Sequence, residues 1–140
     1  MNIIYKDNKK IKVDKLIKLY TSVNWKSYIN NPDILPKIIK KSLYSISAWD
    51  KNELVGFIRV VGDGLSIIYI QDLLVEPKYH RKSIGKILLT KVFDKYSNVR
   101  QSVLITDSKD KANIFYQSLG LKLVKEMGIN AYIKINDDSK

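Results

Sequence analysis

The first 45 residues carry apolar positions at the spacing of amphipathic helices. One stripe, at i, i+3, i+4 and i+7, consists of Val13, Leu16, Ile17 and Tyr20. A second stripe follows the turn signal at residues 31–33 and consists of Leu35, Ile38, Ile39 and Leu43. This spacing puts each set on one helix face. The pattern therefore predicts two helices, preceded by a short strand over residues 2–5.

From residue 44 onward the pattern changes to that of β-strands. Residues 44–49 and 54–61 are rich in β-branched and aromatic side chains, and the polar residues 50–53 separate them. Such a pair predicts a β-hairpin. Residues 65–75 then form a nearly continuous apolar run, which is typical of a central strand that is buried on both faces.

The last third of the chain alternates between the two patterns. Apolar stripes predict helices over residues 84–92 and 112–119, with Gly120 as the stop of the second helix. Strands are predicted for residues 103–106, 121–124 and 129–135. The resulting order predicts a mixed α/β (α+β) protein, with a central sheet of about six to seven strands flanked by about four helices.

Length and composition fit one domain over residues 1–140, with residues 136–140 as a frayed tail. The chain has no cysteine, so it offers no disulfide, no thiolate zinc site and no cysteine nucleophile. No ligand cluster suggests a metal. Lysines and an aspartate interrupt the apolar residues near the N-terminus, and no later stretch has the roughly 20 apolar residues of a membrane span. We therefore expect a cytoplasmic protein that does not enter membranes.

The chain is strongly basic, with 25 Lys and Arg against 14 Asp and Glu, a formal net charge of +11. Such a surplus can attract polyanions, either nucleic acid or a nucleotide cofactor. Outside residues 78–86, however, the basic residues are spread along the chain. A nucleic-acid-binding module is therefore the less favoured interpretation, because its basic residues should gather on one face.

Residues 73–89 run from the predicted buried strand, through a basic loop, into a predicted helix. The first turn of a helix presents unpaired backbone amides and the positive end of the helix dipole. Gly85 permits close approach of a ligand to the backbone, and His80, Arg81, Lys82 and Lys86 add donors. This arrangement suits a diphosphate. An ordinary strand, proline turn and helix would give the same pattern without any ligand.

The loop contains Val75-Glu76-Pro77, then His80-Arg81-Lys82-Ser83-Ile84-Gly85 and Leu88-Leu89. This series resembles motif A of the GNAT superfamily of N-acetyltransferases, in which a Gln/Arg-x-x-Gly-x-Gly/Ala loop opens a helix. His80 stands where Gln or Arg is usual, and Ser83 replaces the first Gly. Both replacements are compatible with the motif, since His can donate a hydrogen bond and Ser is a favoured helix N-cap.

Further along, residues 112–121 read Ala-Asn-Ile-Phe-Tyr-Gln-Ser-Leu-Gly-Leu. They resemble motif B of the same superfamily, Ala-x-x-x-Tyr-x-x-x-Gly-Phe, with Leu121 in place of Phe. Two motifs in the right order are more specific than either alone. Residues 20–25 and 69–72 also resemble a group of small bacterial members.

The resemblance implies direct transfer of the acetyl group from acetyl-CoA to a primary amine of a small molecule or peptide. It implies that Leu74 and Val75 pair with the pantetheine arm, and that the diphosphate meets the amides of Arg81, Lys82, Ser83, Ile84, Gly85 and Lys86. His80 would also contact the cofactor, and Asn113 could contact the pantetheine. Tyr116 matches the motif-B tyrosine that protonates the departing thiolate. Family members often dimerise, which leaves a homodimer open.

Three residues carry further hypotheses. Asp72 is a candidate general base, because a carboxylate within an apolar strand is costly unless it lies in a cleft or is paired; a supporting salt bridge is the competing interpretation. Trp25 and Tyr28 could form an aromatic wall for a cationic amine, or pack the helices onto the sheet. A catalytically weak CoA-binding regulator is the alternative to an active enzyme.

Overall fold

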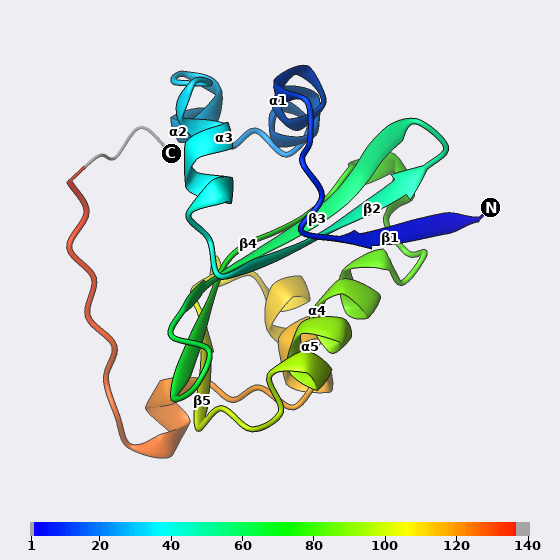
Figure 1. Cartoon of the computed structure of the whole chain (residues 1–140). Coiled ribbons are helices and arrows are strands. Elements are labelled where there is room, and N and C mark those ends of the chain that lie inside the picture. Colours follow the sequence, from blue (N-terminus) through cyan, green and yellow to red (C-terminus); the bar gives the residue numbers. More distant parts are fainter. Residues whose placement is uncertain (1, 137–140) are drawn as a thin grey trace.

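The computed structural model describes residues 2–136 and has a five-stranded sheet at its centre (Figure 1). The strands lie in chain order: β1 (Ile3–Asp7), β2 (Tyr44–Asp50), β3 (Glu53–Gly62), β4 (Ile67–Val75) and β5 (Gln101–Leu104). The first four pair antiparallel, and β5 pairs parallel to β4. Of the predicted frayed tail, only residue 136 lies within the described residues.

Helices cover both faces of this sheet (Figure 1). On one face lie α1 (Val13–Ser22), α2 (Lys26–Ile29) and α3 (Ile34–Lys40); on the other lie α4 (Ile84–Lys95) and α5 (Asp110–Ser118). Short 3-10 helices occur at η1 (Pro77–Tyr79) and η2 (Val124–Met127). The α/β fold class and the four predicted helices are confirmed, and α2 is an additional turn in the predicted connection. No helix in the described part of the chain is long and apolar enough to cross a membrane.

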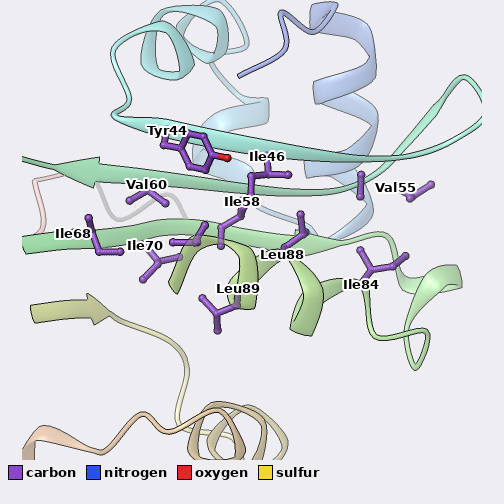
Figure 2. Packing of buried hydrophobic residues seen from close by; sticks show 12 residues of the cluster. Tyr44, Ile46, Val55, Ile58, Val60, Ile68, Ile70, Ile84, Leu88 and Leu89 are labelled. Atoms are coloured by element: carbon purple, nitrogen blue, oxygen red, sulfur yellow. The ribbon is translucent and has the colours of Figure 1, made fainter. Parts of the chain in front are cut away.

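Two hydrophobic cores lie on opposite faces of the sheet. Figure 2 shows the first core, in which side chains from β2, β3 and β4 pack against Ile84, Leu88 and Leu89 of α4. The second core joins Leu16, Leu19 and Tyr20 of α1 to Phe57 of β3 and Leu74 of β4. The apolar stripe of α1 that the sequence predicts is therefore the face that covers the sheet.

A β-bulge in β4 decides which side chains belong to which core. The partner of Arg59 is Asp72, and the partner of the next residue, Val60, is Ile70, so Gln71 is the extra residue of the bulge. Side chains alternate along a regular strand, and one extra residue exchanges the two faces. Ile70 consequently belongs to the core under α4, whereas Leu74 belongs to the core under α1.

The sheet is smaller than the sequence predicts. Residues 121–124 and 129–135 form no strand: η2 occupies Val124–Met127, and the neighbouring residues pair with no strand of the described chain. Both strand predictions are wrong for this structure, because a strand needs the edge of another strand and these segments lie against none. β5 also begins two residues before the predicted segment 103–106 and ends at Leu104, which frees residues 105–109 as a loop.

Candidate functional site

The strands β4 and β5 separate about halfway along β4. Their parallel pairing runs from Ile67 opposite Gln101 to Ile70 opposite Leu104. Beyond this point, residues 72–75 of β4 keep their pairing with β3, and residues 71–75 have no pairing with β5 in the described chain. The separation coincides with the Gln71 bulge. Leu74 and Val75, predicted to pair with the pantetheine arm, therefore lie on a strand whose second edge is open.

The loop after β4 leads directly into the start of α4. Ser83 is the N-cap residue, in the left-handed conformation with φ 64° and ψ 14°, and its side chain makes no capping hydrogen bond. Arg81 is also left-handed, with φ 65°. The first helical bond runs from the amide of Ile87 to the carbonyl of Ser83, at 2.9 Å. The amides of residues 84–86 precede that bond and have no partner within the helix.

This helix start has the features of an anion site. The side chains of Arg81, Lys82 and Lys86 are exposed around it, and the helix dipole adds partial positive charge. The side chain of Ile84 is instead buried in the first core, which leaves only its amide for a ligand. The structure thus brings the predicted phosphate-binding residues 81–86 together at the end of β4.

Hydrogen bonds hold the loop against the strand end. His80 Nε2 lies 3.1 Å from the carbonyl oxygen of Val75. A carbonyl only accepts, so this nitrogen carries the hydrogen of the bond. Tyr79 donates from its hydroxyl to Asp50 Oδ2 at 2.6 Å, and the Glu76 carboxylate accepts from the amide of Lys78. His80 therefore fixes the loop in this structure.

A pocket of about 280 Å³ opens where β4 and β5 separate. Its walls come from β4, the end of β5 with its following loop, the α1–α2 connection and α5. The lining residues are Trp25, Ile70, Gln71, Leu73, Leu104, Ile105, Thr106, Asp107 and Tyr116. Crevices at the carboxyl ends of parallel strands are common ligand sites in α/β proteins.

Tyr116, which lies on α5, lines this pocket and carries a phenol group. Burial raises the pKa of Tyr116, and the nearby charge of Asp107 adds to this increase, whereas hydrogen bonding with Thr106 lowers it. The neighbouring Phe115 ring lies edge-on, with 5.0 Å between ring centroids. A tyrosine phenol is protonated at neutral pH even at its ordinary pKa of about 10, so Tyr116 can act as a proton donor there.

Asp72 lies beneath this region in a buried network. The residue is 1% exposed as a whole, and its carboxylate pairs with Arg59, with 2.7 Å between Nε and Oδ2. Tyr20 donates to Oδ2 at 2.9 Å and Tyr28 donates to Oδ1 at 3.3 Å. Burial raises the pKa of both tyrosines, and the Asp72 charge raises it further. The supporting salt bridge that the sequence left open is therefore present; a role as base stays a prediction.

The two predicted aromatic substrate residues have different surroundings. Trp25 lines the pocket, whereas the Tyr28 hydroxyl accepts from Arg59 Nη2 at 3.1 Å and is part of the Asp72 network. The Trp25 ring packs near Tyr20 and Tyr28, with centroid distances of 5.7 Å and 6.5 Å. Asn113 is half-buried on α5, three residues before Tyr116.

Sequence reasoning missed Gln71, Thr106, Asp107 and Arg59. Thr106 ends the predicted strand 103–106 and Asp107 directly follows it, a position where polar residues often meet ligands. Arg59 is a lone charge within an apolar strand, which signals a buried partner such as Asp72. Among residues 2–136, no group of three or more His, Cys, Asp or Glu side chains is placed to hold a metal ion.

The sequence matches the family model described as "Acetyltransferase (GNAT) domain" over residues 8–137. A GNAT-family acetyltransferase from Streptococcus pneumoniae TIGR4 has a similar structure, with 31% sequence identity, a TM-score of 0.86 and coverage of 98% of this chain and 100% of that chain. No curated protein matches the sequence.

Two solved structures with lower identity share the fold. One is the aminoglycoside N-acetyltransferase AAC(6')-Iy in complex with CoA, with 13% identity, a TM-score of 0.71 and coverage of 98% and 95% of the two chains. The other is an aminoglycoside acetyltransferase from an uncultured soil metagenomic sample, in complex with sisomicin, with 20% identity, a TM-score of 0.69 and coverage of 96% and 97%.

Proposed function

This chain belongs to the GNAT acetyltransferase family, and we propose that it moves the acetyl group of acetyl-CoA to a primary amine of a small molecule or peptide by direct transfer. The observation that carries this proposal is the open edge of β4 at residues 71–75, which leads into the unpartnered amides at the start of α4. An extended amide chain ending in a diphosphate fits such a surface, because the strand edge offers backbone hydrogen bonds and the helix start offers an anion site.

Within this proposal, residues 81–86 bind the diphosphate and residues 74 and 75 orient the pantetheine. Acetyl-CoA supplies an activated thioester. The left-handed residues Arg81 and Ser83 turn the backbone so that the first amides of α4 stay free of a side-chain cap. Arg81, Lys82 and Lys86 balance the phosphate charge.

Tyr116 acts as the general acid. The amine nitrogen forms a bond to the acetyl carbon, the carbon–sulfur bond breaks, and the phenol gives its proton to the leaving sulfur. Support comes from its place in the pocket, where the phenol is protonated at neutral pH and so has a proton to give. The chain needs no nucleophile of its own for this route.

Asp107 is the pocket carboxylate that we assign to the acceptor amine. Among the pocket-lining residues it alone carries a formal charge, so it can attract an ammonium group and accept its proton. The Trp25 ring lines the pocket from the α1–α2 connection and can contact the cation through its face. Asp72, whose carboxylate is bonded to Arg59, Tyr20 and Tyr28, serves in this scheme as an anchor beneath the site.

The first test is calorimetry of the purified protein with acetyl-CoA and with CoA, followed by a thiol-release assay over a panel of amines. The panel contains a polyamine, lysine, a peptide and sisomicin, the last because a protein of the same fold binds it. We expect saturable binding and turnover with at least one amine. Absence of binding to either form of the coenzyme would overturn the proposal, and tight binding without turnover would favour the regulator.

The second test compares Tyr116→Phe with Tyr96→Phe. Tyr96 is the C-cap residue of α4, lies edge-on to the Tyr44 ring and does not line the pocket. Loss of a general acid typically costs 10²- to 10⁴-fold in rate. We expect a loss of that order in kcat for Tyr116→Phe with coenzyme affinity unchanged, and no change for Tyr96→Phe. Equal kcat values for the two variants would exclude the acid role.

A further inference from the structure

The pocket between β4 and β5 has a polar rim and an apolar base. Among its lining residues, Ile70 is 3% exposed, and Leu73 and Leu104 are half-buried. Thr106 and Asp107 line the same pocket and are exposed. An occupant therefore meets polar groups next to the solvent and aliphatic side chains further inside, an arrangement that fits a ligand with one polar end and an apolar tail.

The volume of the pocket limits the size of its occupant. About 280 Å³ lies just below the range of roughly 300–1,000 Å³ that is typical of sites for drug-sized ligands. It equals the liquid volume of about nine water molecules. The acetyl group of a bound thioester takes part of this space, because Tyr116 lines the same pocket. The space that remains fits a small amine better than a peptide or a drug-sized amine.

Asp107 places a negative charge next to the phenol of Tyr116. Its Oδ1 accepts a hydrogen bond from the amide of Lys109 at 3.0 Å, which orients the carboxylate just before α5. Burial is the larger cause of the raised pKa of Tyr116, and the Asp107 charge adds to it. The carboxylate and the phenol are thus close enough to interact. An amine nitrogen that reacts beside Tyr116 therefore also feels the charge of Asp107.

No positive side chain balances this charge among the described residues that line the pocket, because none of them is Lys, Arg or His. Arg59, in the buried network beneath, donates to Asp72 Oδ2 and to the hydroxyl of Tyr28. Its guanidinium is therefore already paired. A second carboxylate in this pocket would lie near Asp107 without a counter-ion, which is unfavourable.

This charge distribution distinguishes an α-amino acid from the amine that its decarboxylation yields. Both molecules carry the same primary amine and the same side chain. In the amino acid the carboxylate is fixed two bonds from the nitrogen, so it approaches Asp107 whenever the nitrogen approaches the thioester. In the decarboxylated amine a hydrogen takes the place of the carboxylate, and an apolar tail can lie against Ile70, Leu73 and Leu104.

From these observations we infer that the acceptor is a small primary amine with an apolar tail and no carboxylate, of the kind that decarboxylation of an amino acid produces. Asp107 selects this amine because it attracts an ammonium group and repels a carboxylate. The overall step converts the ammonium ion and the thioester into an N-acetyl amide, the free thiol of CoA and one proton. The inference rests on the proposed acetyl transfer and narrows its acceptor.

Three matched amines test the role of charge. Isoamylamine, leucinamide and leucine share one tail and differ at one position, which carries a hydrogen, a neutral amide or a carboxylate. Their rates are compared at equal concentrations of the neutral amine, because the three amino groups differ in pKa. We expect similar kcat/KM values for isoamylamine and leucinamide, and a value for leucine that is lower by roughly 10- to 100-fold, since water screens part of the repulsion at the exposed Asp107. Leucine turnover equal to that of isoamylamine would overturn the inference. Leucinamide turnover as slow as that of leucine would do the same, because size rather than charge would then exclude leucine.

Asp107→Asn tests whether this residue makes the selection. The variant neither attracts the ammonium group nor repels the carboxylate, so the ratio of kcat/KM between isoamylamine and leucine should fall close to one. Asp110→Asn is the matched control, because Asp110 lies in the first turn of α5 and does not line the pocket. It should keep the ratio of the parent protein. An unchanged ratio in Asp107→Asn would reject Asp107 as the selecting residue.

Two further measurements separate a failure of this inference from a failure of the proposed transfer. Sisomicin and a tetrapeptide amide test the size limit: turnover of either at the rate of isoamylamine would keep the transfer and overturn the inference. If the protein binds CoA but acetylates no amine, calorimetry of the CoA complex with isoamylamine and with leucine decides. Binding of isoamylamine alone would support the inference although the transfer fails. Equal binding of both amines, or of neither, would overturn it.

Discussion

Arg59 and Asp72 face each other across β3 and β4 and form a buried ion pair, with 2.7 Å between Nε and Oδ2. Their side chains are 7% and 0% exposed. Tyr20, Tyr28 and Ser42 complete the hydrogen bonds around the pair. The ion pair therefore ties the two long central strands to α1, α2 and the end of α3 directly beneath the proposed site.

Removing one partner should destabilise the protein, because the other charge is left buried. We expect Asp72→Ala to lower the free energy of unfolding by about 3–5 kcal/mol. The double variant Arg59→Met, Asp72→Leu should recover much of this loss, since it removes both charges. Urea unfolding followed by circular dichroism measures both changes, with Asp94→Ala on the exposed face of α4 as the control. A parent-like stability of Asp72→Ala, together with loss of turnover, would instead support the role as base.

The sequence shows that Asp72 is an unusual charge within an apolar strand, but not which face of the sheet it lies on or which residue it pairs with. The strict alternation of β4 would put residues 70, 72 and 74 on one face. The bulge at Gln71 interrupts this alternation, so that Ile70 faces α4 while Leu74 faces α1. Neither the bulge nor the pairing with Arg59 has a local sequence signal, because both depend on the register between two strands.

The helices could be predicted because their sequence signal is local. The stripes at residues 13–20 and 84–92 are properties of single segments, and each forms a helix over one core. The apolar alternation of residues 129–135 is equally local, but strand formation needs a partner edge that the segment does not contain. Periodicity therefore predicted a strand that this chain alone does not form.

Ser83 should be replaceable by Gly with a gain in stability. Its φ of 64° lies in the left-handed region, which costs a residue with a Cβ roughly 1–2 kcal/mol, and its side chain makes no capping bond. Part of this gain is offset by the larger chain entropy of Gly in the unfolded state. We expect Ser83→Gly to raise the free energy of unfolding by about 0.5–1 kcal/mol.

Ser83→Ala is the matched variant, because it removes the hydroxyl and keeps the Cβ. Its free energy of unfolding should lie within about 0.5 kcal/mol of the parent protein. Chemical denaturation of the three proteins measures the difference. A marked loss in Ser83→Ala would show that the hydroxyl, rather than the backbone conformation, matters at this position.

Asp107→Asn should weaken the binding of cationic amines. Loss of a charge-assisted contact is expected to raise KM for a cationic amine by roughly tenfold. The Asp107 charge also contributes to the raised pKa of Tyr116, after burial. Removing that charge lowers this pKa, so the alkaline decline in kcat, where the phenol loses its proton, should begin at lower pH.

Asp110→Asn is the control for this change. Asp110 lies in the first turn of α5 and does not line the pocket. Steady-state kinetics across pH 6 to 11 compare the two variants with the parent protein. Identical KM values and identical alkaline limbs for Asp107→Asn and Asp110→Asn would rule out the assignment of Asp107 to the acceptor amine.

Gly56 should be required for the position of α4. A Cβ at this residue would meet Ile84 Cγ2 at 2.9 Å, Ala48 Cβ at 3.3 Å and Leu88 Cδ1 at 3.3 Å. Ile84 is the first residue of α4, so relief of this contact must move the helix start that carries the proposed phosphate site. We expect Gly56→Ala to lower the free energy of unfolding by about 1–3 kcal/mol and to weaken CoA binding in calorimetry.

Gly85→Ala provides the contrast, because its Cβ would meet Phe115 and Val75 only at 3.7 Å, and its stability should match the parent protein. If the two alanine variants were equally stable, the close approach of α4 to β3 at Gly56 would not determine where the helix begins.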